Sequence, residues 1–178
     1  MTTVREAFER YLAINGFSTA TYTAPTVDIP IGPLTVPLPN TKGRQAIVRW
    51  HDLHHVVTGY GTDLVGEAEI GAWELRAGCT SLAAYVYNGM AAATGLVIAP
   101  LRTLRAFRDA AGCTTLYRLE LDFDEALARS VGELRAMTGV PPAGMARRPA
   151  RLHSAAPRGA ASDRVAAGLG GRSDRIRE

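Results

Sequence analysis

Three of the four histidines of this 178-residue chain fall within five consecutive positions. On a helix, His51 and His55 would lie one turn apart on the same face, a spacing that lets two imidazoles bind one metal ion. Asp52 follows His51 directly, and Glu67 follows His55 after eleven intervening residues. Mixed nitrogen and oxygen donors suit Zn²⁺, and also Fe²⁺ or Mn²⁺, because they do not select strongly among these ions. The sequence therefore predicts a divalent metal site, with zinc as the first candidate, and four ligands: His51, Asp52, His55 and Glu67.

A pair of antiparallel helices would bring the histidines and the glutamate to the same height. Apolar residues at helical spacing predict one helix over residues 46–57 and a second over 62–78, joined by Gly59-Tyr60-Gly61. His55 and Glu67 each lie five residues from the turn, about 7.5 Å along their helices. We therefore expect a central helical hairpin that holds the metal between its two arms.

The same helical geometry makes predictions for two neighbouring positions. His54 points roughly 100° away from His55, so it is not expected to share the ion. Gly71 would lie opposite His51, one turn beyond Glu67, and its missing side chain predicts a space through which a substrate could approach the metal.

Other interpretations of the motif account for it less well. A zincin would need His-Glu-x-x-His with glutamate as the general base, and Asp52 has a shorter reach. A phosphohydrolase of the His-Asp type needs further His and Asp ligands on other helices, and His153 is the only histidine left. An ordinary pair of surface or core histidines would not explain why an aspartate, helix-breaking glycines and a carboxylate at matching height coincide.

The remainder of residues 1–140 is predicted to be mainly α-helical and to form a single metal-binding domain around the hairpin. Further helices are indicated by apolar spacing and capping residues over 3–14, 100–111 and about 122–138. Five prolines within residues 17–41 forbid a helix there, and alternating apolar residues favour an irregular or hairpin-like segment.

No charged side chain occurs over residues 77–101. This length could span a bilayer, which needs about 20 apolar residues. Its many alanines and polar residues such as Asn88 and Thr94 keep the segment only mildly hydrophobic, so we predict a buried central helix instead. Two interpretations of the small residues in 82–98 stay open: close packing against a neighbouring helix, and an apolar groove for a prenyl tail.

The positive charge of the chain is concentrated at its end. Residues 1–140 carry 12 basic and 14 acidic side chains, whereas 141–178 carry eight arginines and three acids. The end segment is rich in Pro, Gly, Ala and Ser and predicts a disordered Arg-rich tail. We expect no nucleic-acid partner, because the body is slightly acidic. Widely spaced Cys79 and Cys113 favour free thiols, and the charged N-terminus disfavours a secretory signal, so a cytoplasmic location is predicted.

The pattern His-Asp-x-x-His, eleven residues, then Glu, with Thr58-Gly59 and Gly66 flanking, resembles the motif of the ubiquinone (coenzyme Q) biosynthesis protein 4 family. The resemblance spans residues 40–140 in the order of the helices. It implies a mostly helical, often dimeric protein with a metal at the four motif positions. Members of that family are implicated in oxidative decarboxylation of a prenylated benzoquinol precursor and in organising biosynthetic enzymes at the membrane.

From this resemblance we expect a metal-dependent decarboxylase of a hydrophobic hydroxy-aromatic acid, for example a prenylated one, located peripherally at the inner face of the membrane. The motif identifies no catalytic residue beyond the metal ligands, and no organic cofactor is expected. The alternative is a non-catalytic scaffold that binds a prenylated intermediate and recruits biosynthetic enzymes. A divergent metallohydrolase is a third interpretation, and it predicts cleavage of peptides or phosphoesters.

Overall fold

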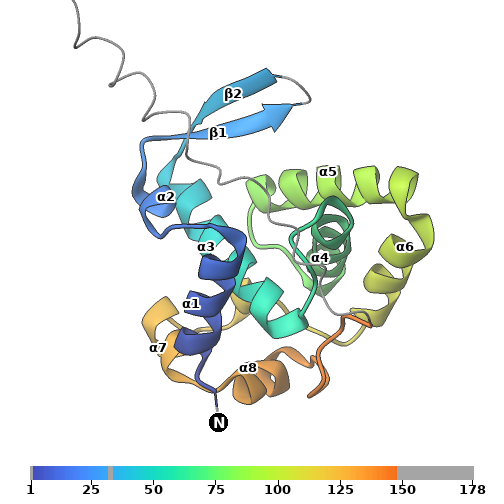
Figure 1. Cartoon of the computed structure of the whole chain (residues 1–178). Coiled ribbons are helices and arrows are strands. Elements are labelled where there is room, and N and C mark those ends of the chain that lie inside the picture. The colour runs from blue at the N-terminus through green and yellow to red at the C-terminus, as the bar shows by residue number, and fades with distance from the viewer. Residues whose placement is uncertain (1, 32–33, 148–178) are drawn as a thin grey trace, which may run out of the picture.

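The computed structural model describes residues 2–31 and 34–147. Within these residues the protein is mainly helical, as predicted, and its strands form one antiparallel hairpin. Figure 1 shows this hairpin projecting from a body made of helices. The elements are α1 Val4–Asn15, α2 Ala20–Thr23, β1 Thr26–Ile31, β2 Leu34–Pro39, α3 Lys42–Thr58, α4 Leu64–Ala77, α5 Leu82–Ile98, α6 Pro100–Asp109, the 3₁₀ helix η1 Leu116–Arg118, α7 Phe123–Ala128 and α8 Val131–Thr138.

The predicted helical hairpin is formed by α3 and α4. Thr41 caps α3, and Gly59, with a φ of 80°, ends it in the left-handed conformation. Asp63 caps α4 by accepting a hydrogen bond from the backbone N–H of Gly66 at 2.7 Å. A Cβ atom at Gly66 would collide with the backbone carbonyl of Gly61, so only glycine allows this tight connection. Local capping therefore sets both ends of the turn between the histidines and the glutamate.

The buried helix at the centre of the body is α4, which packs against α5, α6 and α3. Because these three helices cover α4, its buried polar residues must find partners inside the protein. The side chains of α4 that are almost completely removed from solvent are Ala68, Ile70, Ala72, Trp73 and Glu74.

The prediction that the uncharged segment forms a buried central helix is wrong. This segment forms α5, which buries one narrow row against α4: Ala84, Asn88, Ala92 and Gly95. The close-packing interpretation of the small residues is confirmed, since a Cβ atom at Gly95 would overlap Ala68 and Thr103. The large apolar side chains of α5 are exposed instead. No helix in the described part of the chain is long and apolar enough to cross a membrane.

The first helix begins and ends where the sequence predicts. Thr3 and Glu6 form a reciprocal capping box, and Gly16 ends α1 with a φ of 65°. The buried face of α1 packs against α3 and α7. This position brings Tyr11 beside His55 and Asp52 of α3.

Three segments differ in detail from expectation. The proline-rich segment forms the expected hairpin, a regular antiparallel ladder in which Val27 pairs with Leu38, but residues 20–23 before it form the short helix α2, where the prolines predict none. The predicted last helix is divided into α7 and α8, because Ser130 and Glu133 form a second capping box. The backbone N–H of Met145 donates to the Thr58 carbonyl at 2.7 Å, so the packed body continues through residues 141–147. Residues 148–178, also predicted to be disordered, lie outside the described residues. Both cysteines are free thiols.

Candidate metal centre

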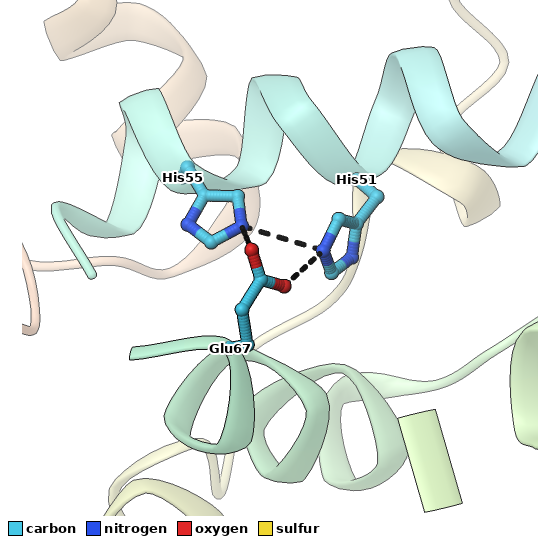
Figure 2. A group of neighbouring side chains, drawn as sticks. All are labelled: His51, His55 and Glu67. Atoms are coloured by element: carbon cyan, nitrogen blue, oxygen red, sulfur yellow. Dashed lines mark hydrogen bonds and ion pairs between the residues drawn. The ribbon is translucent and has the colours of Figure 1, made fainter. Parts of the chain in front are cut away.

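His51, His55 and Glu67 meet between α3 and α4, as Figure 2 shows. The Nε2 atom of His51 lies 3.3 Å from Nε2 of His55 and 3.3 Å from Oε2 of Glu67. The Nε2 atom of His55 lies 3.7 Å from the other Glu67 oxygen. These three side chains are the only group of His, Cys, Asp and Glu residues in the described ranges that could hold a metal ion. The hairpin therefore brings together three of the four predicted ligands.

Both imidazoles are held so that the same nitrogen faces this centre. The Nδ1 atom of His51 lies 2.8 Å from Oε1 of Glu74, and Nδ1 of His55 lies 3.1 Å from the carbonyl oxygen of Tyr60. Each oxygen accepts a hydrogen bond, so Nδ1 carries the proton in both rings when they are neutral. The lone pairs of the two Nε2 atoms then point toward Glu67. Such outer partners orient metal-binding histidines in many proteins.

The fourth predicted ligand, Asp52, lies elsewhere. Its carboxylate accepts hydrogen bonds from the hydroxyl of Tyr11 at 3.0 Å and the hydroxyl of Tyr22 at 2.5 Å. Burial raises the pKa of Asp52 even though His51 and the two tyrosines oppose the shift. Asp52 thus connects α3 to α1 and α2, and it is absent from the group that could hold an ion. Its role as a ligand stays a prediction.

His54 does not face the centre, as predicted from its helical position. It is completely buried, with Nδ1 2.8 Å from Oε1 of Glu74. Its Nε2 atom accepts a hydrogen bond from the backbone N–H of Leu116 at 2.8 Å. Burial lowers the pKa of His54 despite the nearby Glu74. His54 is therefore a neutral group that connects α3 to η1.

Glu74 belongs to this site although the sequence motif does not include it. Its carboxylate is completely buried and is contacted by four side chains: His51 and His54 at Oε1, and Asn88 and Tyr117 at Oε2. Glu67 and Glu74 are seven residues apart, two helical turns, and so lie on the same side of α4. That spacing was the signal available in the sequence.

The charges around His51 favour its protonated form when no ion is bound. Burial alone lowers the pKa of His51, but Glu74 and Glu67 outweigh it and hold that pKa well above its usual value. Burial raises the pKa of Glu74, but His51 and His54 hold it well below its usual value. The pKa of Glu67 is also lowered against burial, mainly by His55 and His51. A bound cation would take the place of the proton on Nε2 of His51, beside Glu67, while Nδ1–H would keep its hydrogen bond to Glu74.

We expect zinc affinity to rise with pH up to and beyond the usual histidine pKa of about 6.5. The sign follows because His51 must lose its proton before Nε2 can bind an ion, and its raised pKa moves this loss to higher pH. Competition titrations with a chromophoric chelator at several pH values would measure the dependence. If the measured zinc affinity stays the same from about pH 6 to pH 8, the prediction is wrong.

The space predicted at Gly71 is occupied by α5. A Cβ atom at Gly71 would lie 2.9 Å from the backbone oxygen of Asn88 and 3.0 Å from Cβ of Ala91. This glycine therefore allows close helix packing and does not provide a substrate entrance. The α4 side chains that face His51 are Glu67 and Glu74, and each of them lies about one turn from Gly71.

Gly71→Ala is accordingly expected to destabilise the protein by about 1–3 kcal/mol, because it overpacks the α4–α5 contact. Gly89→Ala is the matched control, since nothing lies within 4 Å of a Cβ atom at this other helical glycine. The control should be neutral or stabilising, by up to about 1 kcal/mol. Urea unfolding of both variants measures the difference, and equal midpoints would refute the packing argument.

The fold and the site define a helical protein with a candidate His-His-Glu metal centre. No family model, curated protein or solved structure matches the chain. The resemblance to the ubiquinone biosynthesis family is therefore carried by the motif residues alone.

Proposed function

We propose that this protein is a metal-dependent, membrane-proximal enzyme of quinone or related aromatic biosynthesis. Its reaction would be the decarboxylation of a hydrophobic hydroxy-aromatic acid. In the oxidative form of this reaction, O₂ would be the co-reactant. The observation that carries this proposal is the convergence of His51, His55 and Glu67 at one point between α3 and α4.

The residues at this point fit a catalytic metal better than a structural one. Two imidazole nitrogens and one carboxylate are the protein donors of several catalytic zinc sites, and they leave a coordination position open to substrate. The His51 and Glu67 side chains are 22% and 33% exposed, so a small molecule could reach them from outside. A metal held there would act as a Lewis acid on the ring carboxylate or on a neighbouring phenolic oxygen.

The surrounding residues would keep this arrangement in place during the reaction. Glu74 and the Tyr60 carbonyl hold the two imidazoles in orientation. The ring of Tyr11 is stacked on His55 with centroids 5.7 Å apart, which covers one side of the centre. Asp52 fixes Tyr11 by accepting its hydroxyl hydrogen bond. This enclosure would exclude water from one side of the bound substrate.

The outer sides of α5 and α6 support the membrane-proximal part of the proposal. Their exposed apolar side chains form what we call the α5–α6 surface: Leu82, Val86, Met90, Val97, Leu101 and Leu104. Arg105 and Arg108 lie exposed on α6 next to these residues. Apolar groups beside arginines suit the interface of an acidic membrane, where each arginine contributes about 1 kcal/mol. This surface would place the enzyme peripherally, near a lipid-soluble substrate.

We expect the double variant Val97→Glu, Leu101→Glu to lose more than about tenfold in affinity for vesicles of phosphatidylcholine and phosphatidylglycerol. Burying each of these side chains in lipid is worth about 1.5–3 kcal/mol, which glutamate would forfeit. Ile14→Glu on α1 is the control, because Ile14 is exposed outside the α5–α6 surface. Co-sedimentation measures binding. Equal binding of wild type and double variant would refute membrane docking through these helices.

A non-catalytic scaffold is the second candidate, and the exposed α5–α6 surface is the observation that favours it. Homodimer formation and recruitment of biosynthetic enzymes stay predictions for either candidate. The two candidates differ over the metal. An enzyme requires a stoichiometric ion, whereas a scaffold keeps its biological function in His51→Ala and Glu67→Gln variants.

The direct test supplies metal-loaded protein with a prenylated 4-hydroxybenzoate in detergent, with and without O₂, and measures CO₂ release. The enzyme proposal expects turnover that disappears in His51→Ala and Glu67→Gln while the circular dichroism spectrum is unchanged. Absence of CO₂ from metal-loaded wild type, together with functional complementation by both variants, would favour the scaffold.

A further inference from the structure

A second site with chemistry of its own lies beside the metal centre. A cavity of about 470 Å³ opens where the end of β2 meets the first turns of α3 and α5. This size falls within the range of about 300–1,000 Å³ that is usual for small-molecule pockets. Neither His51 nor Glu67 lines it.

Part of the cavity wall is positively charged. Arg44 is part of its wall, and the lining contains no acidic side chain. The Arg44 guanidinium donates a hydrogen bond to the Asn40 side-chain oxygen at 3.0 Å, and it forms no ion pair with the residues that the structure describes. Its charge is thus available to an incoming anion, because a neutral amide does not neutralise it.

Hydroxyl groups and two helix ends reinforce this polarity. Thr41 and Ser81, which cap α3 and α5, both line the cavity. Each hydroxyl oxygen accepts a backbone hydrogen bond from its own helix, at 3.3 Å and 3.2 Å respectively, and so keeps its O–H free to donate. The N-terminal ends of two 17-residue helices add their partial positive charge to that of Arg44.

The other walls are aromatic and apolar. Trp50, Tyr87 and Tyr117 line the cavity together with Ile47. Aromatic rings pack well against flat ligands in offset or edge-to-face arrangements. An aromatic surface beside an arginine and two hydroxyl donors is complementary to a flat ring that carries a negative group at one end.

The cavity and the metal centre share one boundary. The hydroxyl of Tyr117, which lines the cavity, donates to Oε2 of Glu74 at 2.9 Å, and Oε1 of the same carboxylate holds His51. The two sites are therefore adjacent but separated by a buried carboxylate, which an anionic ligand would not displace.

We infer that this cavity is a binding site for an aromatic carboxylate, with the carboxylate at Arg44 and the ring between Trp50, Tyr87 and Tyr117. The inference does not rest on the decarboxylase proposal, because it needs no metal and no reaction. It assigns the region between the β hairpin and α5 a ligand class of its own.

Calorimetric titration of chelator-treated protein with 2-naphthoate tests the inference, and 2-naphthylmethanol serves as the uncharged analogue. The carboxylate should bind, and the alcohol should bind at least about tenfold more weakly because it cannot form a charge-assisted hydrogen bond with Arg44. Arg44→Gln should lower 2-naphthoate affinity by the same factor and leave the affinity of the alcohol unchanged. Equal binding of both probes to wild type, or no binding of 2-naphthoate, would overturn the inference.

Two further variants locate the site. Gly43 lines the cavity, and a Cβ atom at this position would have nothing within 4 Å, so Gly43→Leu should fill the space and abolish 2-naphthoate binding. Gly89→Leu is the matched control outside the cavity and should bind normally. Persistence of 2-naphthoate binding in Gly43→Leu, or its loss in Gly89→Leu, would place the ligand elsewhere and overturn the inference.

Discussion

Replacing Glu74 by alanine is expected to lower the free energy of unfolding by about 3–5 kcal/mol, the usual cost of removing one partner of a buried ion pair. The Glu74 carboxylate is completely buried and accepts hydrogen bonds from four side chains on three other elements. Alanine would leave the Nδ1–H groups of His51 and His54 without an acceptor in the interior. Unpaired buried donors are costly because no water replaces the lost partner.

Urea unfolding near neutral pH would measure this loss. Glu69→Ala is the matched control on the same helix, because Glu69 pairs with Arg102, whose side chain is 46% exposed. The Glu69 carboxylate is itself only 11% exposed, but its removal leaves Arg102 open to water, so the control should lose less stability than Glu74→Ala. A loss for Glu74→Ala no larger than that of the control would show that the four contacts do not stabilise the fold.

His51→Ala is expected to lower zinc affinity by more than about 100-fold. The reason is that loss of a partner outside the coordination sphere already costs about 10–100-fold in many zinc sites, and His51 would bind the ion directly. Glu67→Gln should show a comparable loss. Chelator competition followed by metal analysis of the purified variants would measure both affinities.

The Asp52→Asn variant tests whether Asp52 binds the ion, as the sequence motif predicts, or holds Tyr11 and Tyr22, as in the structure. The structure uses both Asp52 oxygens as acceptors for Tyr11 and Tyr22, so this variant should lose about tenfold or less in zinc affinity. A loss as large as that of His51→Ala would show that Asp52 leaves the tyrosines and binds the ion. If wild type and all variants contain no metal, the site itself is refuted.

The helices that carry the site could be predicted because their signals are local. Capping by Thr41 and Asp63, the left-handed Gly59, and the one-turn spacing of His51 and His55 all involve residues within a few positions of one another. Equal distances from the turn then placed Glu67 opposite them, and the structure agrees.

The predictions for α5 and for Gly71 were wrong for a different reason, because both depend on contacts between distant parts of the chain. An uncharged helix has no polar face to indicate which side meets solvent, so the sequence of α5 could not show that its small residues would be buried and its large ones exposed. Gly71 marked a close approach by α5, which is a contact between distant residues and not an opening.

By itself the sequence determined the helical hairpin and its turn, and which two histidines and which glutamate lie at one height. Only the tertiary structure decided that Asp52 is bound by two tyrosines, that Glu74 is the buried partner of His51 and His54, and that α4 is the central helix. The physical reason is the distance along the chain over which each interaction acts. Capping and helical periodicity act within one or two turns, whereas the partner of a buried polar side chain depends on which distant elements pack around it.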